Sequence, residues 1–175
     1  MSTPTLYAVT VLGHDRPGII AETTGQLAGL GLNLEDSTMT LLRGHFAMML
    51  VCSGGVEGAA IESALAPLTT DGTLTVTVRE VPEETAPAAA GTSWVLTVHG
   101  GDRPGIVSGV VSEVAALGGN ITDLSTRLSG SLYLLVAEFD VPAGTDLDAL
   151  ETAIRTAATA LGVGATLRPA EADEL

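Results

Sequence analysis

Lysine is absent from this chain of 175 residues, and its seven basic side chains are all arginines, set against 21 aspartates and glutamates. The formal net charge at pH 7 is −14. Nucleic-acid binding depends on clustered basic side chains that neutralise phosphates, and anionic membranes attract proteins in the same way. The composition therefore predicts a protein with neither a nucleic-acid partner nor a membrane partner.

Cysteine is limited to Cys52, so a disulfide within the chain is excluded. This residue stands in the apolar run "FAMMLVCSG", where a buried, inert thiol is commoner than a nucleophile. Long apolar runs are also missing, since none reaches the ~18 residues that a membrane-spanning helix needs. The first residues, "MSTPTLYAVT", lack the basic segment and apolar stretch of a secretory signal. Together these absences predict a cytoplasmic protein.

Residue patterns of catalysis are equally scarce. The three histidines, His14, His45 and His99, have no spacing that would give a nucleophile its base and the base its orienting group. The phosphate-loop and dinucleotide-binding glycine patterns are missing, and so is a metal-ligand spacing of His, Cys, Asp and Glu. The sequence thus predicts a protein that is not an enzyme and has no catalytic residues, no metal and no cofactor.

The chain does contain an internal repeat. The stretch "GHDRPGIIAE", residues 13–22, returns 87 positions later as "GGDRPGIVSG", residues 100–109. Two copies are too few for a solenoid, so each copy is expected to be a small domain. Between them, "PEETAPAAAG" is rich in Pro and Ala and is typical of a linker. The predicted boundaries are a first domain at 1–81, a linker at 82–91 and a second domain at 92–170.

Each copy has the same order of expected elements. In the first copy "LYAVTVLG" alternates as a strand does, and the next stretch places at helical spacing Ile20, Thr24, Leu27 and Leu30. Two strands joined by a tight turn at Arg43 and Gly44, a second helix and a last strand complete the unit. The order β-α-β-β-α-β, found twice, predicts an α+β fold of two ferredoxin-like domains. Each would place two helices on one face of an antiparallel four-stranded sheet.

The strands "FAMMLVC" and "YLLVAEF" are apolar on both sides. Strands of this kind are normally covered on both faces of their sheet, and the helices would cover only one. The second face would then be covered either by the sister domain or by another chain. We therefore expect at least a homodimer.

The repeated loop permits two interpretations. Gly13 ends a strand, Asp15 stands where a carboxylate can cap a helix, and Pro17 suits a first helical turn. The loop can be only the start of a helix, or it can be an anion or amino-acid site, because helix N-terminal amides attract carboxylates. Asn33 and Asn120 follow the glycines that end each first helix, where asparagine serves as a left-handed cap or contacts a ligand. The residue patterns alone leave these alternatives open.

The stretches "GHDRPGIIAETTGQLAGLGLNLED" and "GGDRPGIVSGVVSEVAALGGNITD" resemble the signature of the ACT domain, a small regulatory module that senses amino acids. That signature runs from a strand through an Asp/Asn-Arg-Pro-Gly turn and a helix ending in glycine to an asparagine. The resemblance covers nearly the whole chain outside the linker. It implies an amino-acid ligand at an interface between modules. The implied ligand-binding residues are Gly13, His14, Asp15, Gly18, Asn33, Gly100, Gly101, Asp102, Gly105 and Asn120.

The resemblance also has a point of departure. Some amino-acid-binding relatives have asparagine in the turn, where this chain has Asp15 and Asp102. A carboxylate at this position suits the ammonium group of a ligand. The family then implies a stand-alone regulatory protein, such as a regulator of transcription, that binds a small amino acid (glycine or serine) and signals through a protein partner. The alternative is a module that binds no ligand and only assembles subunits, or the regulatory subunit of an enzyme on another chain.

Overall fold

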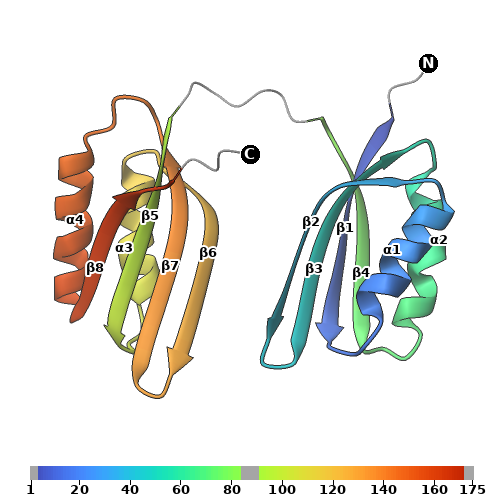
Figure 1. Ribbon diagram of the computed structural model, residues 1–175, viewed down its shortest axis with the longest axis horizontal. Coiled ribbons are helices and arrows are strands. Elements are labelled where there is room, and N and C mark those ends of the chain that lie inside the picture. Colours follow the sequence, from blue (N-terminus) through green and yellow to red (C-terminus); the bar gives the residue numbers. More distant parts are fainter. Residues whose placement is uncertain (1–3, 84–90, 172–175) are drawn as a thin grey trace. The chain divides into compact units, whose positions relative to one another are not determined.

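The structure, a computed structural model, describes residues 4–83 and 91–171. The chain divides into two compact units, Met1–Thr85 and Ala86–Leu175, and each has its own sheet and helices (Figure 1). Most of the expected linker, residues 82–91, lies outside the described residues.

The first unit is a four-stranded antiparallel sheet with its helices on one face (Figure 1). Its elements are β1 (Thr5–His14), α1 (Ile19–Gly29), β2 (Asn33–Leu42), β3 (His45–Gly54), α2 (Gly58–Leu65), a short 3-10 helix (Ala66–Thr69) and β4 (Leu74–Val81). The strands lie in the order β2-β3-β1-β4. Arg43 (φ 51°) and Gly44 (φ 83°) form the tight turn between β2 and β3, as the sequence predicts.

The second unit repeats this architecture. Its elements are β5 (Thr92–Gly101), α3 (Ile106–Ala116), β6 (Asn120–Ser129), β7 (Leu132–Val141), α4 (Leu147–Ala160) and β8 (Val163–Pro169). The strands lie in the order β6-β7-β5-β8, which corresponds strand by strand to the first unit. The prediction of two ferredoxin-like β-α-β-β-α-β domains is therefore confirmed. No helix of the described residues is long and apolar enough to cross a membrane.

Each unit has a core between its sheet and its helices. In the first unit, alternate residues of the two central strands are buried, among them Val9, Val11 and Leu50. In the second unit, Leu96 and Phe139 occupy the same layer and are fully buried. Aromatic side chains are few, so aliphatic side chains make up most of both cores.

The predicted buried face of the first helix is partly wrong. The buried side chains of α1 are Ile19, Thr23 and Leu27, whereas Ile20 is 45% exposed. Thr23 can lie in the core because its hydroxyl donates to the carbonyl oxygen of Ile19 at 2.8 Å. A hydrophobic pattern overlooks such a threonine. The expected positions Ile20 and Thr24 are therefore each one residue too late, whereas Leu27 and Leu30 do pack against the core.

The outer face of the first sheet, turned away from its helices, carries apolar and threonine side chains together with the charged Asp36 and Arg79. Strand pairing places Met49 on this face between Thr10 of β1 and Thr38 of β2. Leu12 lies on the same face, two residues after Thr10 along β1. Leu12 is 49% exposed and Met49 is 46% exposed. This face therefore agrees with the expectation that a second layer covers the sheet.

The outer face of the second sheet is more polar than the sequence interpretation assumed. Strand pairing places Glu138 beside Asp123, and Arg127 and Arg168 lie on the same face. All four side chains are exposed. In the run "YLLVAEF", Leu134 and Val136 share the outer face with Glu138, so the expectation that this strand is apolar on both sides is only partly wrong.

The edge strands β2 and β6, each of which follows the first helix of its unit, contain a β-bulge at equivalent positions. The pairing of β2 with β3 shifts between Leu34 and Asp36, and that of β6 with β7 shifts between Ile121 and Asp123. Such a bulge leaves one residue unpaired and increases the local twist of the strand.

Candidate functional site

The loop that follows β1 is held by two backbone hydrogen bonds. The amide of His14 donates to the carbonyl oxygen of Thr73, and the amide of Asp15 donates to that of Gly44, both at 3.0 Å. At Gly13 (φ 152°) the backbone passes so close to Thr73 that a Cβ atom would lie 2.0 Å from the Thr73 carbonyl oxygen. Only glycine fits this close approach.

The loop after β5 shares the close approach at its first glycine. Gly100 has a φ of 156°, and a Cβ atom there would lie 2.8 Å from Cγ1 of Val163. Gly101 is the last residue of β5. The first glycine of each repeated loop therefore lets the end of the first strand pack closely against the start of the last strand of its unit.

Each first helix begins at a glycine and not at an aspartate. Gly18 and Gly105 are the N-cap residues, both with a φ of 92°, and neither helix start has a side-chain cap hydrogen bond. The interpretation of Asp15 and its counterpart Asp102 as helix caps is therefore wrong. The left-handed glycine turns the chain so that its own carbonyl accepts the first helical bond, and the aspartate is left exposed ahead of Pro17.

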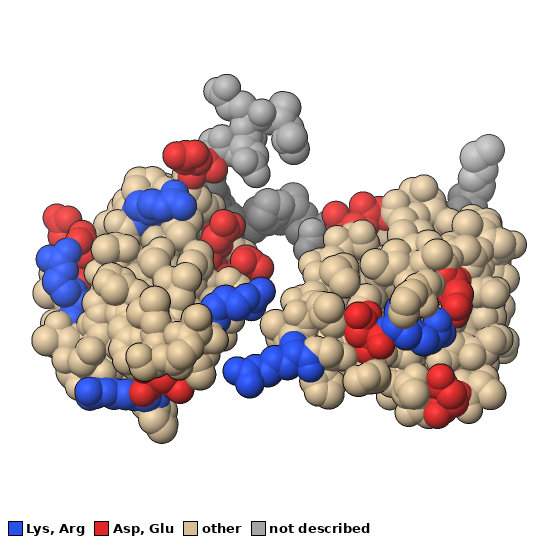
Figure 2. Space-filling model, turned by 60° about the horizontal axis from the view of Figure 1, so that its bottom comes forward, with Lys and Arg blue, Asp and Glu red and all other residues tan. Residues whose placement is uncertain are grey.

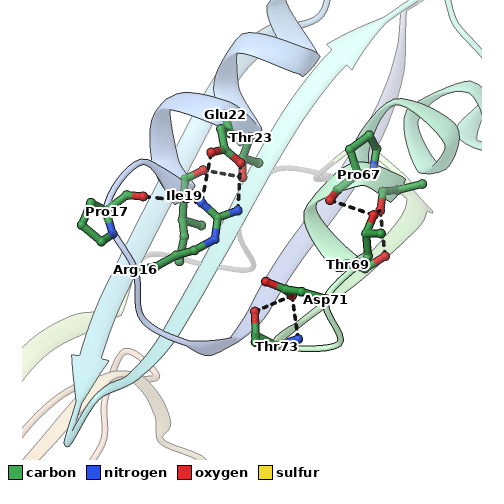
Figure 3. Close-up of polar contacts among 11 residues, drawn as sticks. Arg16, Pro17, Ile19, Glu22, Thr23, Pro67, Thr69, Asp71 and Thr73 are labelled. Atoms are coloured by element: carbon green, nitrogen blue, oxygen red, sulfur yellow. Dashed lines mark hydrogen bonds and ion pairs between the residues drawn. The ribbon is translucent and has the colours of Figure 1, made fainter.

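A bidentate ion pair links the first loop to its helix (Figure 3). The guanidinium of Arg16 donates to both carboxylate oxygens of Glu22, at 3.0 and 2.9 Å. The hydrogen bond from Arg16 lowers the pKa of Glu22, and the same bond raises the pKa of Arg16. Nearby, the hydroxyl and amide of Thr73 donate to Asp71, which lowers the pKa of that carboxyl.

A cavity opens beside each loop, between the first turn of the helix and the β-hairpin that follows it. The first cavity has a volume of about 460 Å³ and is lined by Asp15, Arg16, Gly18, Ile19, Ile20, Ala21, Met39, Leu41 and Phe46. The second has a volume of about 450 Å³ and is lined by Asp102, Arg103, Gly105, Ile106, Val107, Ser108, Val111 and Tyr133. Each loop thus offers one carboxylate and one guanidinium above mostly apolar walls.

Only part of the expected site comes together in these cavities. Both aspartates of the turn line them, and so do both N-cap glycines. The hairpin residues Met39, Phe46 and Tyr133 were missed by the sequence reasoning. Their place could have been inferred from the fold, because the third strand of a split β-α-β-β-α-β unit pairs with the first and begins beside its end.

Asn33 and Asn120 lie far from the loops of their own units. They are the only asparagines in the chain and are the first residues of β2 and β6. Asn33 pairs with Ser53 and so lies level with Leu6, whereas the loop follows Gly13 at the other end of β1. Seven strand residues separate these ends, or about 23 Å at ~3.3 Å per residue. Within one unit, a small ligand cannot contact both the loop and the asparagine.

Neither asparagine is a left-handed helix cap. That conformation belongs to Gly31 and Gly118, with φ values of 76° and 75°. The amide of Leu32 donates to the carbonyl of Leu27, which completes the cap of the first helix. The side chains of Asn33 and Asn120 are exposed and serve no cap.

The histidines and the cysteine form no reactive cluster. His14 and His45 face each other across β1 and β3, with ring centroids 6.4 Å apart and an interplanar angle of 84°. Cys52 is buried, and burial raises the pKa of its thiol. Residues 4–83 and 91–171 contain no group of three or more His, Cys, Asp or Glu side chains that could hold a metal ion. Basic side chains lie singly among acidic and uncharged ones on the face seen in Figure 2.

Comparison with known proteins identifies relatives over most of the chain. The sequence model of the ACT domain matches residues 6–79 and again 92–167. The glycine cleavage system transcriptional repressor of Escherichia coli K12 is 26% identical over 168 residues, which cover 92% of this chain and 88% of the repressor.

Solved structures share the two-unit fold. The crystal structure of an unknown protein from Galdieria sulphuraria matches with a TM-score of 0.82 and 26% identity, covering 97% of this chain and all of that one. A structure provisionally named as a glycine cleavage system transcriptional repressor matches with a TM-score of 0.71 over 97% of this chain and 99% of that one. Its 20% identity supports the fold alone.

Proposed function

The chain belongs to the ACT domain family, and on that premise we propose that it is a regulatory protein that binds a small amino acid at an interface between modules. It reports the ligand through a protein partner and not through DNA, since its net charge of −14 disfavours contact with phosphates. The similarity to a repressor supports the regulatory role. A single reduced thiol suits a cytoplasmic location.

The observation that carries this proposal is the twofold occurrence of a loop with one cavity, one carboxylate and one guanidinium. Backbone amides at the start of α1 and α3 suit the carboxylate of an amino acid. The exposed carboxylates of Asp15 and Asp102 suit its ammonium group. Each loop has an aspartate followed directly by an arginine, so it presents a negative and a positive charge side by side. A zwitterion therefore matches the loop better than a simple anion or cation does.

The position of the asparagines supports a shared site. A ligand on the loop of one module can meet Asn33 or Asn120 only when a second module brings that residue close, since the strand separates them within a unit. An amide can both donate to and accept from the polar end of the ligand. The proposed ligand-binding residues remain the two loops with their glycines and aspartates, and the two asparagines.

We expect calorimetry to detect binding of a small amino acid, glycine or serine, at millimolar concentration or below. Asn33→Ala and Asn120→Ala should weaken binding about tenfold for each ~1.4 kcal/mol lost with their hydrogen bonds. Gln26→Ala is the matched control, because it removes an exposed amide from α1 that no proposed contact uses. Full affinity in both asparagine variants would place the ligand elsewhere.

A screen in which none of the twenty amino acids binds would favour the other function that the sequence left open. The chain would then be an assembly module, or the regulatory subunit of an enzyme on another chain. In that case the outer face of the first sheet would be the surface through which it binds another subunit.

We also expect the chain to be at least a dimer in solution. The outer face of the first sheet exposes Leu12 and Met49, whereas that of the second sheet exposes Leu132 and Leu134 beside the charged Glu138 and Arg127. A second copy of the first sheet is the better match, and stable interfaces bury roughly 1,600 Å² in total. Light scattering should give a mass of at least twice 17.7 kDa.

A charge on that face tests the expected interface. Met49→Glu should shift the protein to the monomer, because a buried unpaired carboxylate opposes association. Leu117→Glu is the control, since Leu117 is also exposed, at 38%, but follows helix α3. A monomeric wild-type protein at high micromolar concentration would contradict this expectation.

A further inference from the structure

The two repeated loops differ in the charges that surround their arginine. Arg16 is occupied by a carboxylate of the same chain, since both of its terminal nitrogens donate to Glu22, at 3.0 and 2.9 Å (Figure 3). Asp71 adds a second negative charge that acts on Arg16 through space. The carboxylates of Glu22 and Asp71 therefore both act on one guanidinium.

The second unit lacks both of these carboxylates. Glu22 corresponds to Gly109 at the offset of 87 residues. Leu74 pairs with Gly13 in the first unit, and Val163 pairs with Gly100 in the second. The last strands of the two units therefore correspond at an offset of 89 residues, and the counterpart of Asp71 is Ala160.

Arg103, the counterpart of Arg16, has no ion-pair or hydrogen-bond partner among the described residues. Its guanidinium lies across the end of helix α4, 3.1 Å from the place of a Cβ atom at Gly162. The residue Arg103 also lines the cavity of about 450 Å³, together with the hydroxyl-bearing Ser108 and Tyr133. An arginine so placed keeps its paired N–H groups available for a bidentate carboxylate.

We propose that the two cavities are not equivalent, and that Arg103 makes the second one the selective site for a carboxylate-bearing ligand. In the first unit Glu22 holds Arg16 in the way that a ligand carboxylate would and competes with it. This inference rests on the proposed function for its ligand class. It goes beyond it in assigning unequal affinities to two loops that have the same sequence signature.

The arginine side chains themselves provide a direct test. Seven arginines and no lysine give a simple NMR spectrum of side-chain Nε–H groups, in which Arg16 and Arg103 can be assigned by substitution with glutamine. The probes are glycine and acetate, which share a carboxylate and differ in the ammonium group. We expect titration to shift the Arg103 signal and to leave the Arg16 signal in place.

The outcomes separate this inference from the proposed function. A shift of Arg103 with acetate but no binding of any amino acid would support the inference and overturn the amino-acid ligand. Binding of glycine with the Arg103 signal unmoved would overturn the inference and leave the proposed function standing. No response to either probe, or equal shifts of both arginines, would overturn the inference.

Exchanging the acidic partner between the units gives a second test. Glu22→Gln replaces the charged partner of Arg16 with a neutral amide, over which a ligand carboxylate is preferred, and should add a second binding event for glycine. Gly109→Glu gives Arg103 an internal carboxylate and should weaken binding about tenfold or more. Arg103→Gln should weaken it equally, with Arg16→Gln as the matched control of little effect. The opposite ranking of the two arginine variants would overturn the inference.

One of these variants needs a check of its fold. A Cβ atom at Gly109 would lie 2.8 Å from Cδ1 of Leu161, which is the far end of a flexible side chain and can move. Circular dichroism will detect a misfolded protein. Glu22→Gln adds no atoms to the core and decides the question even if Gly109→Glu does not fold.

Discussion

Replacement of Phe139 with alanine is expected to destabilise the second unit by about 3 to 5 kcal/mol, the usual cost of deleting a large core side chain. Phe139 is fully buried and is the largest side chain in the chain with almost no exposed surface. It lies on β7 in the middle of a core made otherwise of aliphatic residues. Its cross-strand partner on β5 is Trp94, which is itself packed against this core.

The single tryptophan makes this effect measurable for one unit alone. Trp94 lies on β5 and packs against the core that contains Phe139, so its fluorescence reports on unfolding of the second unit. Phe139→Ala should lower the denaturant midpoint of the fluorescence transition. Leu50→Ala, a deletion in the core of the first unit, should leave that midpoint unchanged while lowering the stability seen by far-UV circular dichroism. A fluorescence transition shifted equally by both variants would mean that the units unfold together.

Gly13→Ala should destabilise the first unit by about 2 to 5 kcal/mol, the combined cost of a positive φ and of an overpacked contact. The new Cβ atom would lie 2.0 Å from the carbonyl oxygen of Thr73 and 2.9 Å from the Cα atom of Leu74. Both obstacles are backbone atoms, so no side-chain rotation removes the clash. The hydrogen bond from His14 to Thr73 would be lost as the segments separate.

Gly25→Ala is the matched control for this prediction. Gly25 lies in the middle of α1, and a Cβ atom there would meet no atom within 4 Å. Alanine favours the helix over glycine, so this variant should be more stable by about 0.5 to 1 kcal/mol. Urea unfolding followed by circular dichroism should therefore move in opposite directions for the two variants. A neutral Gly13→Ala would show that β1 and β4 do not approach so closely in solution.

The fold could be predicted from the sequence because its signals are local. Strand alternation, the Arg43-Gly44 turn and the glycines that end the first helices each depend on a few neighbouring residues. The repeat then supplied the same order of elements twice, and the ferredoxin-like topology is a common solution for that order. The burial of Thr23 was missed because its hydroxyl is satisfied by its own helix, which no hydrophobicity pattern records.

The candidate site was harder to predict because it depends on contacts distant in the sequence. Asp15 was expected to cap the helix, but backbone bonds to Gly44 and Thr73 orient the loop so that Gly18 takes the cap position. The pair of Arg16 with Glu22 joins a loop residue to a helix residue six positions later, which is not a standard helical spacing. The contribution of the hairpin to each cavity follows only from the pairing of the first and third strands.

The bulges in β2 and β6 have a consequence for how this protein can associate with itself. An edge strand is a template on which further strands can add without limit, as happens in fibrils. Here the edge strands β2 and β6 lose their regular row of amides and carbonyls after Leu34 and Ile121, and an exposed aspartate follows two residues later. An incoming strand would meet a twisted ladder and a negative charge at these two edges. The opposite edges, β4 and β8, pair regularly with their neighbours, so strand addition in each unit is disfavoured on one side of the sheet, and a chain of added strands cannot continue through both.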